Sequence, residues 1–193
     1  SSAASDVYKR QLADVVTFGV APSTMIYYTL SVIDYPSFLQ SPPQYSFDVY
    51  RTVIPYLAFL MAAFSALRLA KFNIDTRQTD SFIGLPTPAN ALFWGALILT
   101  NPYWIENNSW SLFCILALML TSCYLLVCEL PMFALKFKHW TWKGNTIRYC
   151  FMILTIVVLC LFGVLKGWWI VIACYFLISL YLYITGKSKR ISK

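Results

Sequence analysis

The sequence has little charge and almost no histidine. Charged residues make up 12% of its 193 residues, and His139 is the only histidine. So low a charge excludes an ordinary soluble domain. His139 stands among loop cations, which argues against histidine-based catalysis. Glycine-rich phosphate loops, the GxSxG nucleophile elbow and internal repeats are also absent from the sequence.

The cysteines form no metal-binding or redox pattern. All six lie in apolar stretches, without a CxxC pair and without a nearby histidine. A zinc site needs clustered ligands, so we interpret these cysteines as small buried thiols.

Long apolar stretches dominate what is present. Hydrophobic residues make up 59% of the chain, and the mean hydropathy is +0.63. Each long stretch is close to the ~20 residues that cross ~30 Å of hydrocarbon. In lipid, a single segment satisfies its own backbone only as a helix. We therefore predict an all-α, polytopic transmembrane helical bundle with six spans, at residues 12–33, 52–72, 88–104, 111–128, 149–165 and 168–185.

The basic residues predict the orientation of these spans. With Lys9 and Arg10 set aside, 13 of the 15 basic residues remain, and all but Arg51 and Lys166 lie on one side of the predicted bundle. Basic loops and the C-terminus are therefore expected in the cytoplasm. The net charge of +7 then reflects topology and attraction to anionic headgroups. No nucleic-acid partner is expected, because the charges are scattered over loop ends.

The amino terminus differs from the rest of the chain. Residues 1–11 are polar, lack an initiating Met and contain no signal-peptide core. Their sequence resembles a translated sequencing-adapter fragment. We expect residues 1–11 to be a non-native leader, with the first helix beginning at Leu12.

Asp14 lies two residues into the first predicted span. An acidic residue in the first turn of a helix commonly interacts with the helix dipole, and a functional carboxylate is the alternative. Gly19 and its small neighbours allow a second helix to approach closely, and Pro22 can kink the span. These features suit a water-accessible pocket and plain helix packing equally well.

Arg68 and Lys71 lie near the end of the second predicted span. Long cationic side chains near helix ends commonly snorkel towards the interface. Against this interpretation, Ser65, Arg68 and Phe72 follow three- and four-residue spacing and share one helix face. Since Asp14 and Arg68 have opposite charges near the same boundary, one pocket could hold metal and phosphate together.

Gly84, Pro86 and Pro88 follow in a short polar link. We interpret them as structural residues that shape the turn into the next helix, rather than as substrate contacts. Pro88 in particular fits the preference for proline in a first helical turn.

Three blocks carry a resemblance to a known family. They are LADVVTFGVAP (residues 12–22), SALRLAKFN (65–73) and GLPTP (84–88). They closely resemble the phosphatidylserine synthase branch of the CDP-alcohol phosphatidyltransferase family. The resemblance is strong from residue 12 to about residue 100, and the later spans match mainly in hydropathy.

The resemblance makes 12–104 the C-terminal part of the catalytic core and 105–193 further helices with a basic cytoplasmic tail. The family signature is D-x-x-D-G-x-x-A-R, a spacer, then G-x-x-x-D-x-x-x-D, and Asp14 matches its last aspartate. The other signature residues would precede Leu12. The resemblance thus implies about eight spans in the intact protein and an inactive segment here.

The family's activity implies the remaining roles. It is the transfer of a phosphatidyl group from CDP-diacylglycerol to the hydroxyl of L-serine, with release of CMP, in the bacterial inner membrane. Asp14 would be the general base and one ligand of Mg²⁺ or Mn²⁺. Arg68 would bind a carboxylate or phosphate, Lys71 the phosphates, and Asn73 would position polar groups.

Two alternatives stay open at this stage. One is a related phosphatidyltransferase with another acceptor alcohol. The other is a non-enzymatic transporter or scaffold, although a transporter would be expected to show paired interrupted spans and inverted repeats. The oligomeric state is undetermined, with a homodimer as one alternative.

Overall fold

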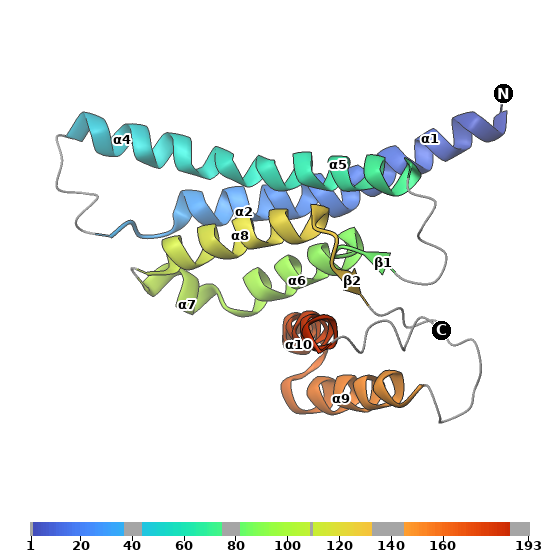
Figure 1. The fold of residues 1–193 in the computed structure, drawn as a ribbon. Helices are drawn as coiled ribbons and strands as arrows, with labels where there is room; N and C mark the ends of the chain where they lie inside the picture. The colour runs from blue at the N-terminus through green and yellow to red at the C-terminus, as the bar shows by residue number, and fades with distance from the viewer. Residues whose placement is uncertain (1, 37–43, 75–81, 109, 133–144, 186–193) are drawn as a thin grey trace.

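The computed structural model describes residues 2–36, 44–74, 82–108, 110–132 and 145–185, which are nearly all helical (Figure 1). The elements are α1 (Ser2–Val15), the π-helical turn η1 (Val16–Val20), α2 (Ala21–Val32), α4 (Gln44–Val53), the 3₁₀ turn η2 (Ile54–Phe59), α5 (Leu60–Ile74), β1 (Phe82–Ile83), α6 (Thr87–Thr100), α7 (Pro102–Asn107), α8 (Ser111–Val127), β2 (Pro131–Met132), α9 (Thr146–Phe162) and α10 (Val164–Ile184). Outside the described residues lie His139, Arg77, and most of the basic residues that predict orientation.

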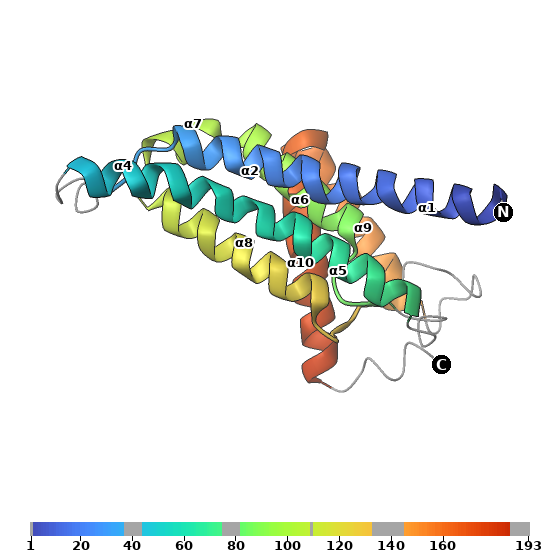
Figure 2. The same ribbon diagram turned by 90° about the horizontal axis from the view of Figure 1, so that it is seen from above.

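Two long compound helices run antiparallel and side by side (Figures 1 and 2). The first joins α1, η1 and α2, and the second joins α4, η2 and α5. Pro55 is buried in the first turn of η2 and has no N–H to donate to the helix that continues from α4. The helices α6 and α8 pack beneath this pair.

The prediction that the first helix begins at Leu12 is wrong. Helix α1 begins at Ser2 and continues through residue 12 without a break. The preceding residues contain no glycine or proline and include the good helix formers alanine, lysine, arginine and glutamine. An Asp6–Lys9 ion pair of 3.8 Å spans one turn of this segment. Asp14 therefore lies in the last turn of α1, which removes the first-turn dipole interpretation.

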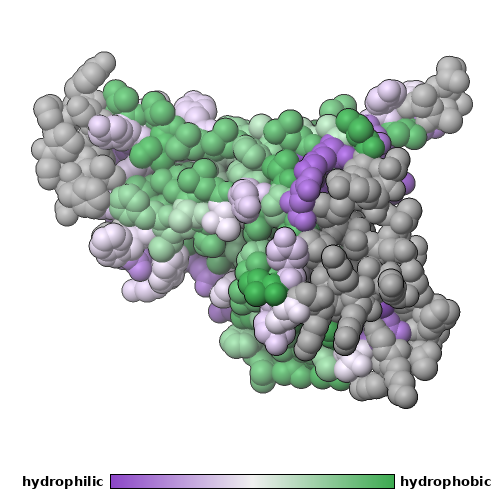
Figure 3. All heavy atoms as spheres, viewed as in Figure 1, coloured by the Kyte–Doolittle hydropathy of each residue, from purple (hydrophilic) through white to green (hydrophobic). Residues whose placement is uncertain are grey.

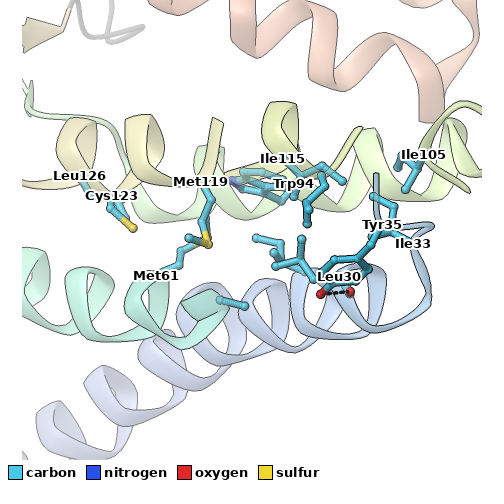
Figure 4. Packing of buried hydrophobic residues seen from close by; sticks show 13 residues of the cluster. Leu30, Ile33, Tyr35, Met61, Trp94, Ile105, Ile115, Met119, Cys123 and Leu126 are labelled. Carbon is cyan, nitrogen blue, oxygen red and sulfur yellow. Dashed lines mark hydrogen bonds between the residues drawn. The ribbon is translucent and has the colours of Figure 1, made fainter. Parts of the chain in front are cut away.

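The main core lies between α2, α5, α6 and α8. Trp94 of α6 is completely buried, and its indole Nε1 donates a hydrogen bond to Ser122 Oγ of α8 at 3.1 Å. Met61 of α5 and Met119 of α8 meet beside this ring, with Leu30 of α2 nearby (Figure 4). The first two-thirds of the chain thus share one contiguous core.

Helices α9 and α10 form a hairpin on the far side of α6. Gly163 makes the turn with φ of +78°, a conformation that other residues rarely adopt. Gly167 allows close contact, because a Cβ there would lie 2.6 Å from Leu159 Cδ2. Helix α10 is seen end-on in Figure 1 and lengthwise in Figure 2, so it crosses the long helices and packs on α6 and α9.

The described residues also include one short β ribbon. Strands β1 and β2 pair antiparallel, with Phe82 opposite Met132 and Ile83 opposite Pro131. Strand β1 lies shortly before α6 in the sequence, and β2 lies shortly after α8. The ribbon therefore joins the segment before α6 to the segment after α8.

The helices are those of a membrane protein, but the structure does not confirm six spans. Three are long and apolar enough to cross a membrane by length and composition: Ser5–Val32, Val49–Ile74 and Val164–Ile184. Helices α8 and α9 are apolar but have 17 residues each, or about 25 Å at 1.5 Å per residue. Apolar residues cover much of the face shown in Figure 3, which suits contact with lipid.

We expect Trp94→Ala to destabilise the fold strongly. The substitution removes a fully buried ring and leaves Ser122 without its donor, a change that costs about 3–5 kcal/mol in protein cores. Reversible unfolding in mixed micelles measures the loss. Trp110, which is mostly exposed, provides the control, and an equal loss in Trp110→Ala would contradict the assigned core.

Candidate active site

The helix that carries Asp14 changes geometry directly after it. Asp14 is half-buried in the last turn of α1. In η1, the backbone N–H of Ala21 bonds to Val16 O, five residues earlier. Pro22 is buried at the start of α2 and lacks the N–H that an ordinary helix would use. A π-helical turn therefore separates Asp14 from this proline.

A hydroxyl group satisfies the backbone beside Pro22. Ser23 Oγ donates to Gly19 O at 2.7 Å. Gly19 is buried against α5, where a Cβ would lie 3.0 Å from Ser65 Cβ and 3.6 Å from Ala62 Cα. Because Gly19 has no side chain, η1 and α5 can approach each other closely. This geometry suits the predicted structural role of Gly19, which stays a prediction.

Arg68 lies on the buried face of α5. Its side chain is only 8% exposed, whereas a snorkelling arginine would expose its guanidinium. Ser65, one turn earlier, is also buried, but Phe72 is exposed, so the expected common face ends at Arg68. Among the described residues, Arg68 Nε and Ser65 Oγ have no hydrogen-bond partner.

The surroundings of Arg68 contain no acid among the described residues. The groups that interact with it electrostatically are the thiol of Cys128, just after α8, and the hydroxyl of Tyr175 in α10. Neither is a carboxylate, and no ion pair within the described ranges includes Arg68. A buried guanidinium without an anion is suited to binding an anionic ligand group.

Lys71 has protein partners that the sequence analysis missed. Its Nζ donates to Val127 O at 3.2 Å and lies 3.4 Å from Glu129 Oε1, in a partly exposed ion pair. A cation at the carboxyl end of α8 also complements the helix dipole. No local sequence pattern links Lys71 to Glu129, because 58 residues separate them. Asn73 is exposed near the end of α5.

The residues just before α6 pack against the carboxyl end of α8. Gly84 has φ of +77°, and a Cβ there would lie 2.9 Å from Cys128 O. Its N–H donates to Leu130 O at 2.9 Å, and the N–H of Leu85 donates to Leu125 O at 2.9 Å. Pro86 then occupies the N-cap of α6, with Pro88 in its first turn. These positions suit the structural roles predicted for Gly84, Pro86 and Pro88.

The structure places several of the predicted residues around the carboxyl end of α8. Lys71 and Gly84 each contact the carboxyl end of α8, and Arg68 lies near Cys128 there. Asp14 lies on α1, which packs against α5, but within the described ranges no ion pair joins Asp14 to Arg68 or Lys71. The shared pocket of Asp14 and Arg68 therefore stays a prediction.

The described residues alone do not fit a divalent-metal site. They contain no group of three histidine, cysteine or acidic side chains placed to hold an ion. Mg²⁺ and Mn²⁺ need several oxygen ligands at fixed geometry, and Asp14 is a single carboxylate. The metal requirement stays a prediction from the resemblance.

Two apolar cavities flank the crossing of α6 and α10. One of about 310 Å³ is lined by Pro86, Pro88, Trp168 and Tyr175, among others. The second, of about 220 Å³, lies between α6, α8 and α10, and its lining includes Asn90.

Comparisons with known proteins agree with the resemblance. A CDP-diacylglycerol–serine O-phosphatidyltransferase of Helicobacter pylori is 39% identical over 106 residues, which are 53% of this chain and 38% of that protein. The protein of the same name from a second strain is 38% identical over 106 residues, with the same coverage. Over about half of its length, the chain is similar to serine phosphatidyltransferases.

A third relative is less similar in sequence, and its name also contains serine. An archaetidylserine synthase of Methanothermobacter thermautotrophicus is 29% identical over 111 residues, covering 58% of this chain and 40% of that protein. The matched segment thus spans about two-fifths of these relatives' length. No protein-family model and no solved structure matches the chain. The resemblance to phosphatidylserine synthases is confirmed by the curated relatives.

We expect Gly84→Ala to weaken the junction between α6 and α8. A positive φ costs a non-glycine residue about 1–2 kcal/mol, and the new methyl group would also press on the carbonyl of Cys128. Thermal unfolding in detergent measures the change. Gly95→Ala in α6 is the matched control, because a Cβ there meets nothing within 4 Å. Equal stability of the two variants would contradict this packing.

Proposed function

We propose that this chain is part of a membrane-embedded transferase that moves a phosphatidyl group from CDP-diacylglycerol to the hydroxyl of L-serine. The observation that carries the proposal is the 38–39% identity to two curated serine phosphatidyltransferases. The name of the archaeal relative also contains serine, which favours serine over other acceptor alcohols. The buried Arg68 supports the proposal, because both substrates carry anionic groups.

The membrane arrangement is part of this proposal. It comprises six spans, a bacterial inner membrane and cytoplasmic basic loops. The apolar helices favour membrane spans, the distribution of basic residues favours the orientation, and the Helicobacter pylori relatives favour a bacterial membrane. Short helices such as α8 could be accommodated by local thinning of the bilayer. A homodimer remains one alternative for the assembly.

The reaction needs a base and an anion-binding group from this chain. The serine hydroxyl oxygen attacks the phosphorus that bears the diacylglycerol, forming a new P–O bond. The bond from that phosphorus to the bridging oxygen breaks, and its electron pair leaves with CMP. Asp14 would accept the hydroxyl proton, and Arg68 would hold a carboxylate or phosphate in place. Lys71 would bind the phosphates only if its ion pair with Glu129 opened.

Activity is best measured in an extended protein. The test protein is a fusion in which the N-terminal part of a Helicobacter pylori relative precedes residues 12–193. CMP release from CDP-diacylglycerol and L-serine in lipid vesicles is the assay. Absence of serine-dependent CMP release from a folded extended protein would contradict the proposed function.

Asp14→Asn in the extended protein should abolish CMP release while membrane insertion is unchanged. The amide cannot accept the hydroxyl proton, and general-base catalysis contributes about 10²-fold or more. Asp34→Asn, at an exposed position after α2, is the matched control. Turnover above about a tenth of the wild-type rate would refute the general-base role of Asp14.

Arg68→Lys should lower activity although it preserves the charge. A guanidinium grips a carboxylate or phosphate through two parallel hydrogen bonds, which an ammonium group cannot do. Steady-state kinetics at varied serine and varied CDP-diacylglycerol would show which substrate Arg68 holds. Arg51→Lys, at an exposed position of α4, serves as control. Unchanged kinetic constants for both substrates would remove Arg68 from the binding site.

A further inference from the structure

The buried face of the first compound helix changes its spacing at η1. Within α2, the buried residues recur at steps of three or four: Pro22, Ser23, Ile26, Thr29 and Leu30. Before α2, the buried or half-buried positions form two pairs, Phe18 with Gly19 and Asp14 with Val15. Successive pairs thus begin at positions 14, 18 and 22, four residues apart. This step exceeds the about 3.6 residues of an α-helical turn.

The extra residue of the π-turn accounts for the wider step. In η1 the N–H of Ala21 donates to Val16 O, five residues earlier, whereas an α-helix bonds four residues earlier. One added residue rotates α1 by about 100° relative to an unbroken α-helix. An unbroken helix, continued back from α2, would place Val16 and Leu12 on the buried face. In the structure these two are 51% and 67% exposed, and Asp14 is half-buried instead.

The face that carries Gly19 and Asp14 is directed to α5. A Cβ at Gly19 would lie 3.0 Å from Ser65 Cβ, and α1 also packs against α5. Because the two compound helices are antiparallel (Figure 2), residues before Gly19 lie opposite residues after Ser65. Asp14 is about 7.5 Å before Gly19 along its helix, and Arg68 is about 4.5 Å after Ser65. The axial levels of Asp14 and Arg68 therefore differ by only about 3 Å.

The residues that follow η1 favour the π-turn locally. Pro22 has no N–H to donate to the carbonyl four residues earlier, so one α-helical hydrogen bond is missing. Ser23 Oγ donates to Gly19 O at 2.7 Å, and Thr24 Oγ1 donates to Val20 O at 3.0 Å. Hydroxyl bonds of this kind commonly distort helices. They engage the last two carbonyl groups of η1.

We propose that the π-turn sets the rotation of α1 so that Asp14 faces α5, and that Pro22 and Ser23 are positioning residues for its carboxylate. They act through the helix and contact no substrate. The role of Asp14 as a base rests on the proposed function, whereas its orientation does not. The two parts of the inference are therefore tested separately.

The orientation is measured by site-directed spin labelling. Single labels are placed at positions 12–18 of the 193-residue chain, with the native cysteines replaced by alanine. The protein is held in nanodiscs of phosphatidylethanolamine and phosphatidylglycerol, and oxygen accessibility is read by EPR. We expect low accessibility at Asp14 and high accessibility at Leu12 and Val16. The opposite pattern, that of an unbroken α-helix, would overturn the proposal.

Variants test what fixes the turn. Pro22→Ala combined with Ser23→Ala should restore an ordinary α-helix and rotate α1 by about 100°, which moves the accessibility minimum from Asp14 to Val16. Further deletion of Thr17, which is exposed in η1, removes the extra residue and should return the minimum to Asp14.

Each outcome of this series decides the proposal. An unchanged minimum in the double variant, or a minimum that the deletion does not return, would overturn it. If the double variant does not fold, the deletion variant decides alone, because its regular helix should fold with Asp14 towards α5. Ser31→Ala is the matched control, since Ser31 Oγ makes the same kind of bond, to Tyr27 O at 2.8 Å, within α2. It should leave the pattern unchanged.

Activity of the extended protein tests the positioning role. The double variant should lower kcat about 10²-fold with little change in the serine KM, and deletion of Thr17 should restore kcat to within about tenfold of wild type. Simple destabilisation would not be rescued by a further deletion. Normal kcat with a rotated Asp14 would refute the positioning role while the transferase stands. A buried Asp14 without CMP release from any folded variant would refute the transferase and leave the π-turn geometry.

Discussion

The burial of the Arg68 guanidinium is the constraint on which the candidate site depends. A charged group in an apolar bundle loses its hydration, and the loss is tolerated only where polar groups or a ligand replace the water. Within the described residues, Arg68 interacts with the thiol of Cys128 and the hydroxyl of Tyr175 and has no carboxylate beside it. A protein anion would have neutralised Arg68 permanently. Its absence from the described surroundings leaves the charge available for an anionic group of a ligand.

The carboxyl end of α8 holds the segments around Arg68 in register. The last carbonyl groups of a helix have no partner within it and must bond elsewhere. Here Leu125 O accepts from Leu85, and Val127 O accepts from Lys71 of α5. The same end of the helix therefore binds both α5 and the entrance of α6. Gly84 permits this, because any side chain at its position would meet the carbonyl of Cys128.

Most of the helical architecture could be predicted from the sequence, and the contacts at the site could not. Apolar stretches mark the helices, and Pro88 marks the start of α6, because hydrophobicity and proline act locally. Helix α1 was missed because its polar residues carry helix propensity without an apolar pattern. The Lys71–Glu129 pair and the contact of Asn90 with Met61 join residues far apart in sequence. Their partners depend on how the helices pack, which periodicity does not encode.

The α9–α10 hairpin brings the later part of the chain to the candidate site. Helix α10 crosses α6 (Figure 2) and brings Tyr175 to Arg68. If no other element covered it, an arginine near a helix end would extend to the membrane interface and remain hydrated. By packing across α6, α10 encloses the α5–α6–α8 junction and lines both cavities beside it. The hairpin thereby helps to turn an interfacial arginine into a buried one, and burial strengthens any hydrogen bond that Arg68 makes to an anionic ligand.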